Sequence, residues 1–577
     1  MRLRRLLPRV PLTAVVRGYS AETGRSDLVA GLTVAVMLVP QAMAYAALAG
    51  MPPETGLYAS LLPVIVYALL GTSGQLAVGP VAIVALLTAT TIAPLAAGDP
   101  IRYVQMASLL ALLVGAMMVL LGLFQVGRIV SFLSHSVISG FTSAAAIVIA
   151  LSQLPALLGV EKVGDGSFVG TISHLGDYLA GVHPLTAILG LAGIGLLLTA
   201  RRIPRIPGPL LLLVLATAAV ALFDLAGHGV EILGRVPAGL PGLTFPALDG
   251  AAVVDLLPGA LTIALLSYAE GISVAKAIAS RTKQRVDPNQ ELVAVGAANL
   301  AAGVVGAFPV AGGFSRSAVN HQAGARTPVA SLVTVAGIAL ALLVATPLLA
   351  YVPDAVLAAV VVTAVFGLVD VRGALEVARF RRLDGAVLGV TFLVTLLVNV
   401  ELGLAVGVGA SILVFLGRTS RPRLVELGRE RATGLFRDRL RRNVETDPRA
   451  LLLRIDGPLY FASAANLVER ITDRLGDEPG IELLVVDAAA VNDLDADAEH
   501  ALSRLADDAR GASVRLVLTS VRAPVRQLLS RSGLYERLGP LGIMDDVTSA
   551  VHAWDPTSPL VSFSEEVAAR SGAMTGA

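Results

Sequence analysis

The amino-acid sequence predicts an α-helical protein that crosses a membrane many times and ends in a small α/β domain. Three observations lead to this fold class. Of the 577 residues, 55% are hydrophobic and only 15% are charged, with a mean hydropathy of +0.75, whereas a soluble domain has about one quarter charged residues. Apolar stretches near the roughly 20 residues that a spanning helix needs recur from residue 28 to residue 417. After Arg418 the sequence turns polar, and short apolar runs then alternate with amphipathic ones.

Fourteen apolar stretches are expected to form spans, some of them too short to cross alone. They cover residues 28–49, 56–71, 76–96, 103–124, 129–153, 184–200, 208–226, 253–279, 290–308, 313–322, 325–349, 354–370, 384–400 and 401–417. The basic connections fall on one side of these spans and hold Arg128, Arg201, Arg202, Arg205, Arg281, Lys283, Arg285, His321, Arg326, Arg372, Arg379, Arg381 and Arg382. The opposite connections hold Asp99, Glu161, Asp165, Asp177, Glu231, Asp249 and Asp354. The positive-inside rule then predicts a multi-pass protein of the bacterial inner (plasma) membrane with both termini in the cytoplasm.

We expect five segments along the chain. Residues 1–26 form a cytoplasmic N-terminal segment, 27–418 the membrane domain, 419–449 a basic linker, 450–556 the α/β domain and 557–577 a tail. Within the α/β domain, 451–455, 481–487 and 514–519 are predicted strands, and 465–475, 496–509 and 524–532 are predicted helices. The arginines of 418–449 are interpreted as the basic flank of the last span, with binding of anionic lipid headgroups as the alternative.

Composition also excludes several function classes. A formal net charge of +1 argues against a nucleic-acid partner, because proteins that bind nucleic acids usually have a strongly basic surface. The chain has no cysteine, and its seven histidines show no HExxH spacing, so neither a metal site nor thiol chemistry is expected. A Walker A pattern is absent, so the sequence offers no cradle for ATP. We therefore expect no cofactor and no enzyme activity.

Glycine and proline interrupt the apolar sequence at two corresponding places, after the second and after the ninth span. The interruptions comprise Gly71, Thr72, Ser73, Gly74, Gly79 and Pro80 in the first half, and Gly303, Gly306, Pro309, Gly312 and Gly313 in the second. Paired breaks of this kind indicate the substrate site of a transporter built from inverted repeats. Half-helices starting near Pro80 and Ser315 would direct their positive N-terminal ends at one central point, which favours an anion. The alternative is that these residues are ordinary packing glycines and kinks.

Two charged residues stand out at membrane depth. Glu270 lies in the middle of the eighth span, where a carboxylate is costly and therefore indicates function. The alternative for Glu270 is a structural ion pair with Lys276 or Arg316. Arg316 lies at the second half-helix and offers a fixed positive charge with a planar fork of donors. The alternative for Arg316 is a position at a helix end, with its charge reaching water.

Four motifs in order carry a family resemblance. They are TGLYAS at 55–60, VGPVA at 78–82, SYAEG at 267–271 and GGFSRSAVN at 312–320. With these motifs the chain resembles the sulfate permease (SulP) family, and residues 450–555 resemble the STAS domain that follows the membrane part in that family. The resemblance implies an inverted repeat of seven plus seven spans, divided into a core and a gate domain. It also implies a homodimer in the lipid bilayer that works as an elevator.

The resemblance further implies which residues bind and couple. The anion would lie between the third and tenth helices, with substrate-binding residues Gln41, Tyr45, Val81, Ala82, Phe314, Ser315 and Arg316. Glu270 matches the acidic position that the family uses for the coupling ion. Sodium-coupled bicarbonate members place an aspartate there and a hydroxyl residue about one turn later, but here Val274 takes the latter place. This departure favours a proton over sodium.

These observations together predict a secondary active transporter of a small inorganic or organic anion, with sulfate or a dicarboxylate before bicarbonate. A nucleobase-proton symporter of the same fold, an uncoupled anion channel or exchanger, and a membrane scaffold are the alternatives. In the STAS domain, Asp495 is followed by Ala496 and Asp497 rather than by a phosphorylatable hydroxyl. Phosphorylation at this loop is therefore not expected, although the domain can still recruit a cytoplasmic protein.

Overall fold

A computed structural model describes residues 19–561 except 128–133, 164–166, 204–206, 235–236, 238, 247–249, 421, 432, 441–443 and 479. Predictions that concern Arg128, Asp165, Arg205, Asp249, residues 1–18 and residues 562–577 lie outside the described residues. The chain forms two compact units, residues 1–411 and 412–577, each of which is described by itself.

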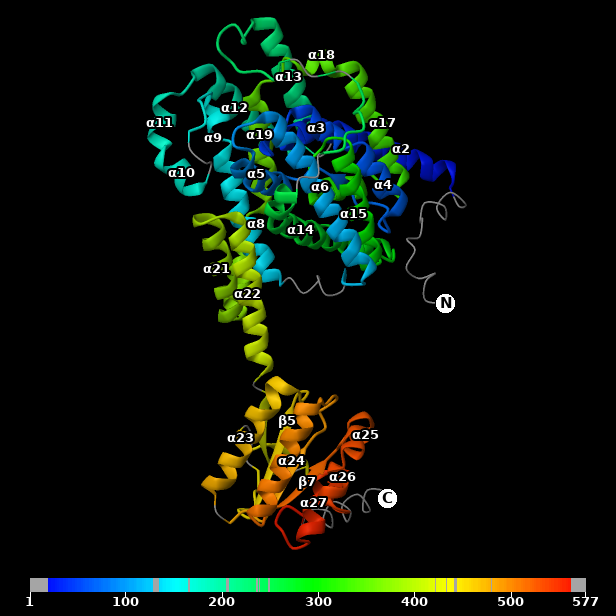
Figure 1. Cartoon of the computed structure of the whole chain (residues 1–577), viewed down its shortest axis with the longest axis vertical. Helices are drawn as coiled ribbons and strands as arrows, with labels where there is room; N and C mark the ends of the chain where they lie inside the picture. Colours follow the sequence, from blue (N-terminus) through cyan, green and yellow to red (C-terminus); the bar gives the residue numbers. More distant parts are fainter. Residues whose placement is uncertain are drawn as a thin grey trace, which may run out of the picture. The chain divides into compact units, whose positions relative to one another are not determined.

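All fourteen predicted spans correspond to helical segments of the structure (Figure 1). These are α2 (Ala21–Leu48), α3 (Pro53–Tyr58) with α4 (Leu62–Leu70), α5 (Ala82–Ala96), α6 (Pro100–Leu123), α8 (His135–Ser152), α12 (Pro184–Ala200), α13 (Gly208–Phe223), α14 (Gly250–Thr282), α15 (Pro288–Val304), α16 (Phe314–Gln322), α17 (Val329–Leu340) with α18 (Thr346–Leu349), α19 (Asp354–Val365), α21 (Arg382–Leu397) and α22 (Val400–Thr419). Eight helical stretches among the described residues are long and apolar enough to span a membrane, and α5, α12 and α13 are shorter apolar helices.

Helix starts follow local sequence signals. The side chains of Ser20, Asp99, Ser134 and Asp287 each accept a hydrogen bond from a first-turn backbone N–H of α2, α6, α8 and α15, respectively. Such caps satisfy donors that have no partner within the helix. Proline follows Asp99 and Asp287 directly, at a position where its missing N–H costs nothing.

Four described helices of the membrane unit were not predicted, namely α9 (Leu154–Leu158), α10 (Phe168–Ser173), α11 (Leu175–Ala180) and α20 (Val371–Phe380). Three of them are only five or six residues long, too short for a hydrophobic period to be visible. In α20, charged residues alternate with apolar ones along VRGALEVARF and no residue is buried. The same arginines made this segment look like a basic loop.

Close helix crossings in the membrane unit depend on glycine. Helices α6 and α15 cross at Gly115 and Gly296, where a Cβ added to Gly115 would lie 2.7 Å from the Gly296 oxygen. A Cβ on Gly296 would likewise lie 2.9 Å from the Gly115 oxygen. Small residues allow backbones to approach in lipid, where apolar side chains gain little by avoiding solvent.

The second unit contains a six-stranded sheet of order β4-β3-β5-β6-β7-β8. Its strands are β3 (Arg423–Arg429), β4 (Phe436–Asp438), β5 (Ala450–Asp456), β6 (Leu483–Asp487), β7 (Arg515–Thr519) and β8 (Ile543–Met544). Strands β5 to β8 run parallel, and β3 is antiparallel to both of its neighbours. The three predicted strands and the three predicted helices are confirmed as β5, β6, β7, α23 (Phe461–Asp477), α24 (Ala496–Gly511) and α25 (Ala523–Ser532).

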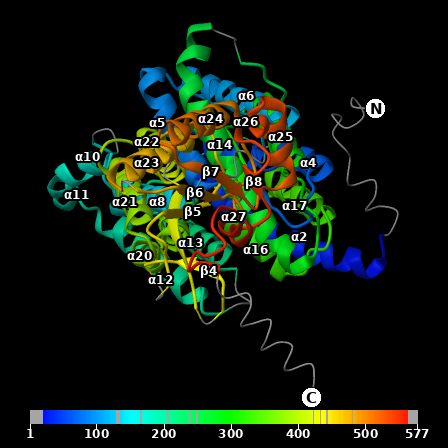
Figure 2. The same cartoon turned by 90° about the horizontal axis from the view of Figure 1, so that it is seen from below.

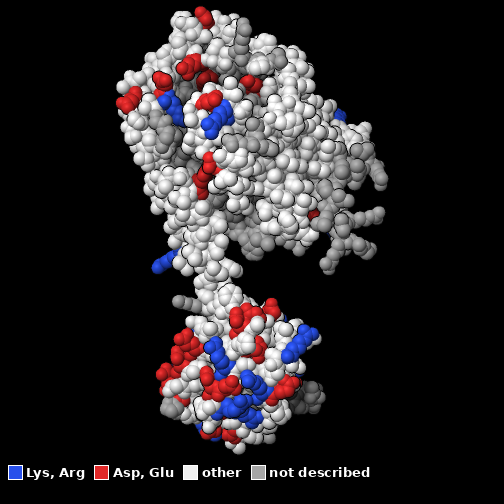
Figure 3. All heavy atoms as spheres, viewed as in Figure 1, with Lys and Arg blue, Asp and Glu red and all other residues white. Residues whose placement is uncertain are grey.

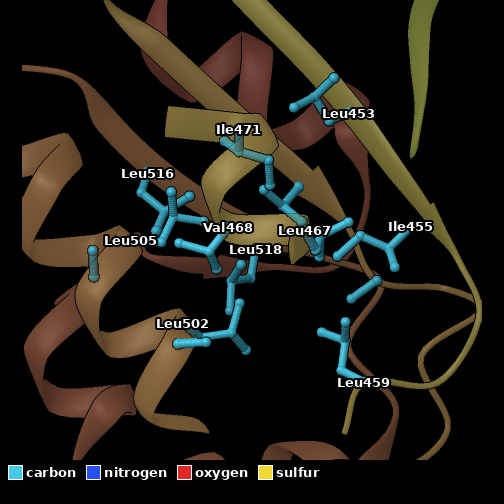
Figure 4. Packing of buried hydrophobic residues seen from close by; sticks show 14 of the residues in the cluster. Leu453, Ile455, Leu459, Leu467, Val468, Ile471, Leu502, Leu505, Leu516 and Leu518 are labelled. Carbon is cyan, nitrogen blue, oxygen red and sulfur yellow. The ribbon is translucent and has the colours of Figure 1, made fainter. Parts of the chain in front are cut away.

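Helices cover both faces of this sheet. Buried residues of α23, α24 and α25 pack on one face of the sheet against alternate residues of β5 and β7. Leu467 of α23, Leu505 of α24 and Leu518 of β7 belong to this core (Figure 4). Helix α27 (Val547–Trp554) packs on the opposite face, and Figure 2 shows it apart from α23 and α24 with the strands between. The alternation of buried side chains between two cores is the two-residue period of a strand.

The structure differs from the expected basic linker at 419–449, because β3 and β4 belong to the sheet. Val425 and Leu427 are buried on the α27 side, whereas Leu424 and Glu426 are only partly buried and Leu424 packs against the opposite core. The dense arginines hid this period of two. Leu560 and Val561, which we placed in the tail, are buried in the same core. The sheet and its cores therefore extend from residue 423 to residue 561.

Asp495 has a structural role at the loop where a phosphorylatable hydroxyl was sought. It is the N-cap of α24, where it accepts a hydrogen bond from the Ala498 N–H at 2.9 Å, and it also accepts one from the Phe461 N–H at 2.7 Å. Asp495 thus joins the starts of α23 and α24.

Charge is distributed very differently on the two units. On the face drawn in Figure 3, large parts of the described surface of the membrane unit carry no Lys, Arg, Asp or Glu, whereas both signs are interspersed over the second unit. Exposed side chains of the membrane helices are instead large and apolar, as at Leu191, Val214, Leu340 and Leu413. A broad uncharged surface of this kind suits lipid, and a mixed charged surface suits water.

Candidate functional site

The two predicted chain breaks meet at one point in the membrane unit. Residues Val78–Gly79 (β1) and Ala311–Gly312 (β2) form a short antiparallel ladder, in which Val78 faces Gly312. The Gly313 N–H donates to the Ala77 oxygen at 2.9 Å, and the Ala77 N–H donates to the Ser317 hydroxyl at the same distance. The breaks from the two halves of the sequence therefore hold each other through backbone hydrogen bonds.

Helices α5 and α16 begin directly after this ladder, at Ala82 and Phe314. Their N-cap residues, Val81 and Gly313, provide no side-chain hydrogen bond to the first turn. An uncapped helix start presents free backbone N–H donors and about half a positive charge. Two such starts, one from each half, border the same cavity.

This cavity has a volume of about 270 Å³. All eight residues that we predicted for substrate and coupling ion line it, namely Gln41, Tyr45, Val81, Ala82, Glu270, Phe314, Ser315 and Arg316. They come from α2, the start of α5, α14 and the start of α16. The structure thus brings together residues that lie up to 275 positions apart in the chain, from Gln41 to Arg316.

Arg316 is nearly fully buried, with 3% of its surface exposed. Its Nη1 donates to the Pro80 oxygen at 2.6 Å, while Nε and Nη2 are buried and make no hydrogen bond to a described residue. The guanidinium fits against the backbone of Gly313, where an added Cβ would lie 2.8 Å from Nη2. Buried donors without partners are costly, so the arrangement is suited to an acceptor that enters the cavity.

Glu270 is half-buried in α14, and its Oε2 is buried without a hydrogen-bond partner among the described residues. Lys276, which we weighed as a structural partner, is exposed, and no ion pair of the described residues joins it to Glu270. Glu270 and Arg316 line the cavity together. The cavity therefore contains a carboxylate that can gain or lose a proton beside a fixed positive charge.

Buried amides hold the second break in shape. The Asn299 side chain donates to the oxygens of Val310 and Val295 and accepts from the Val310 N–H, each at 2.9 Å. Asn320 donates to the Gln75 oxygen at 3.0 Å, which ties α16 to the first break. Sequence reasoning missed Asn299 and Asn320, although an asparagine at membrane depth is itself a signal of polar packing.

A second part of the cavity lining was also missed. It comes from the C-terminal end of α12, the start of α13 and the C-terminal end of α19, with lining residues Leu197, Ala200, Arg201, Pro207, Gly208, Pro209, Val360, Thr363, Ala364, Val365 and Leu368. The sequence Pro-Gly-Pro at 207–209 was the available signal, since it breaks the helix between two apolar stretches. No group of three or more His, Cys, Asp or Glu that could hold a metal is present in the described part of the chain.

Residues 25–391 match the sulfate permease family, and residues 441–550 match the STAS domain. A probable sulfate transporter of Mycobacterium tuberculosis is 35% identical over 546 residues, which cover 93% of this chain and 96% of that protein. Sulfate transporter 4.1, chloroplastic, of Arabidopsis thaliana is 34% identical over 551 residues, covering 91% of this chain and 79% of that protein.

Solved structures show the same fold. The murine Solute Carrier 26 family member A9 anion transporter in the inward-facing state superposes with a TM-score of 0.89 at 24% identity, covering 95% of this chain and 94% of that chain. The transmembrane domain of a cyanobacterium bicarbonate transporter, BicA, superposes with a TM-score of 0.60 at 26% identity, covering 68% of this chain and 98% of that chain.

The predicted fold class, a helical membrane transporter with a C-terminal STAS domain, is confirmed by these likenesses together with the helices and the sheet described above. The matched family consists of transporters and not of enzymes. The match covers well over half of the chain and includes both breaks and every lining residue named above. This chain therefore belongs to the sulfate permease family of anion transporters.

Proposed function

We propose that this protein is a secondary active transporter that binds a small oxyanion between α5 and α16. The observation that carries the proposal is the convergence of two uncapped helix starts and the unpartnered donors of Arg316 on one cavity. Backbone N–H groups and a guanidinium are the donors that bind sulfate-like and carboxylate groups in other proteins. The site residues are Gln41, Tyr45, Val81, Ala82, Phe314, Ser315 and Arg316.

Sulfate or a dicarboxylate is the first substrate class. The relatives named sulfate transporters, at 34 to 35% identity over more than nine tenths of the chain, support sulfate. Bicarbonate is the second class, supported by the likeness to the bicarbonate transporter domain. A nucleobase fits less well, because a fixed positive charge on Arg316 gives an uncharged ring no advantage over an anion.

We infer that protons drive uptake through Glu270. Its carboxyl group lines the same cavity as Arg316. A bound anion therefore favours protonation of Glu270, and protonation of Glu270 in turn makes anion binding more favourable. Val274, one turn further, is buried and offers no oxygen for sodium.

The proposed movement is an elevator in which α2, α5, α14 and α16 slide past α12, α13 and α19. The cavity lies between these two groups of helices, which supports the division. The cavity-lining ends of α12, α13 and α19 adjoin connections rich in arginine, which supports a cavity open to the cytoplasm and cytoplasmic termini. A homodimer, the inner membrane and a cytoplasmic partner of the STAS domain stay predictions from the sequence.

The deciding test is uptake of labelled sulfate, fumarate and bicarbonate into proteoliposomes, with and without an inward proton gradient. Saturable uptake of one anion is expected, with loss in Arg316→Ala and no change in Arg372→Ala, an exposed arginine outside the cavity. Glu270→Gln should lose gradient-driven accumulation while it keeps exchange. Equal uptake by wild type and Arg316→Ala would reject the site, and competition by uracil or xanthine would favour the nucleobase alternative.

Movement can be tested where α5 contacts α22, which we place in the same group as α12, α13 and α19. The Thr91 hydroxyl donates to Glu401 Oε1 at 2.6 Å, and the chain has no native cysteine. In a Thr91→Cys, Glu401→Cys variant, a short bis-thiosulfonate cross-linker should stop transport, and a reductant should restore it. Transport that continues at full rate after complete cross-linking would rule out an elevator movement across this contact.

A further inference from the structure

Arg201 contributes a second positive charge to the cavity, from the part of the lining formed by α12 and α19. It follows the last residue of α12, is exposed, and lines the cavity together with Thr363 of α19. Its Nη2 donates a hydrogen bond to the Thr363 oxygen. The sequence had presented Arg201 only as one of several charges in a basic connection.

The partner of Arg201 is a neutral carbonyl, so the guanidinium keeps its full charge. Among the described residues no carboxylate forms an ion pair with Arg201. A hydrogen bond to a backbone oxygen fixes the direction of the side chain without cancelling its charge. Low-dielectric walls concentrate the field of such a charge in a cavity more than an open surface does.

The charged lining residues give the cavity a definite charge balance. Among the described residues that line the cavity, Arg201 and Arg316 are the cations and Glu270 is the carboxylate. These three side chains together carry one net positive charge when Glu270 is ionised and two when Glu270 is protonated. A lining with two positive charges matches a dianion, whereas Arg316 alone matches a monoanion.

We propose that Arg201 is a specificity-determining residue that supplies the second positive charge and adapts the cavity to doubly charged oxyanions. The inference rests on the proposed function, since it assumes that the anion binds in this cavity. Arg201 acts through its charge on the anion from the α12 and α19 wall, and Arg316 acts from the side of the two helix starts.

Electrostatics gives this proposal a quantitative signature. The Coulomb energy between Arg201 and an anion is proportional to the charge of the anion. Removal of the Arg201 charge should therefore change the logarithm of the affinity twice as much for a dianion as for a monoanion. If the affinity for sulfate falls by about tenfold, the affinity for nitrate should fall by only about threefold.

The alternative role for Arg201 is a cap on α19. Arginine side chains near helix ends stabilise the last carbonyls, and Thr363 lies in the last turn of α19. A cap would affect protein stability, and it would affect every anion equally. Its effect would not scale with the charge of the ligand.

The experiment is competition binding to the full-length purified protein. Labelled sulfate is displaced by unlabelled sulfate or nitrate for wild type, Arg201→Gln, Arg201→Lys and Arg202→Gln. Arg202 is the matched control, because it is the next residue, is exposed and does not line the cavity. Glutamine keeps amide donors for the Thr363 oxygen, and lysine keeps the charge. Melting temperatures of all four proteins report on folding.

We expect Arg201→Gln to lose sulfate affinity by about tenfold and nitrate affinity by about threefold, with Arg201→Lys close to wild type and Arg202→Gln unchanged. Equal losses for both anions, equal effects of Arg201→Gln and Arg202→Gln, or a loss that Arg201→Lys does not rescue would overturn the proposal. A wild type that binds nitrate but not sulfate would overturn it as well. The proposed function fails separately, if the wild type binds and transports no anion at all.

Discussion

Substitution of Asn299 by leucine is expected to disable the anion site without touching the cavity. Asn299 is fully buried in α15 and does not line the cavity. Its side chain holds both backbone polar groups of Val310, four residues before the start of α16 at Phe314. Val310 belongs to the break itself, where no helix or sheet ladder pairs its backbone among the described residues.

The magnitude follows from the two groups that lose their partner. Leucine has the same branching and the same number of side-chain heavy atoms as asparagine but offers no hydrogen bond, so the N–H and the oxygen of Val310 become buried and unsatisfied. Each such group costs about 1–3 kcal/mol, which gives about 2–6 kcal/mol for the segment. A free energy of about 1.4 kcal/mol corresponds to a tenfold change in the dissociation constant. If the lower limit of about 2 kcal/mol disfavours the backbone conformation that binds the anion, the anion affinity should fall by at least about 30-fold.

The assay is sulfate binding and uptake by purified Asn299→Leu, together with thermal stability from size-exclusion profiles after heating. Asn399→Ala is the matched control, since Asn399 accepts a hydrogen bond from the Leu402 N–H at 2.6 Å in the first turn of α22, away from the cavity. It should cost about 1 kcal/mol of stability and leave affinity unchanged. If Asn299→Leu binds sulfate as the wild type does, the argument that Asn299 positions α16 is refuted.

Three further predictions concern packing and the STAS domain. Trp554 is the only tryptophan and packs under Arg449, whose Nη2 lies 3.1 Å from Asp447 Oδ2 and 2.7 Å from Asp555 Oδ2. Burial alone would raise the pKa of Asp447, but hydrogen bonds from Arg449 and Ser558 outweigh burial, so the pKa of Asp447 is lowered. Hydrogen bonds from Thr557 and Arg449 lower the pKa of Asp555 to about 2. Both carboxylates therefore stabilise the fold fully above their unfolded pKa of about 4 and lose that contribution as the pH falls toward 2. The fluorescence of Trp554 should be constant from pH 5 to 8 and should change at lower pH. In Arg449→Gln this change should begin at a higher pH than in the wild type. A change that begins at the same pH in both proteins would contradict the assignment. Gly115→Ala should destabilise the membrane unit by about 1–3 kcal/mol, measured by thermal melting, because the added methyl group overpacks against Gly296 and Leu300. Gly195→Ala is the control, since a Cβ at Gly195 meets open space, and it should leave the melting temperature unchanged or raise it. Leu467→Ala should cost about 2–5 kcal/mol and lower the urea midpoint read from Trp554 fluorescence, while Leu440→Ala, 94% exposed, should leave that midpoint in place.

The sequence by itself determined the elements that depend on local chemistry. Length and apolarity of a stretch predict a span because the bilayer imposes both, and fourteen of fourteen stretches are helical. The two Gly and Pro clusters predicted the breaks, because unpaired backbone at membrane depth needs a partner. Glu270 and Arg316 were found because charge at that depth is costly. Motif order then indicated which side chains share the site.

Only the tertiary structure decided which distant groups meet. The period of two in β3 was hidden in an arginine-rich segment, since pairing with β4 and β5, and not composition, decides which residues of β3 are buried. Asn299 in the sequence indicates at most polar packing, and only its contact with Val310 showed that it shapes the second break. Arg201 shared its sequence context with Arg202, and only the packing of α12 against α19 points one of them at the cavity. Such differences arise from contacts between elements far apart in the chain, which no local pattern encodes.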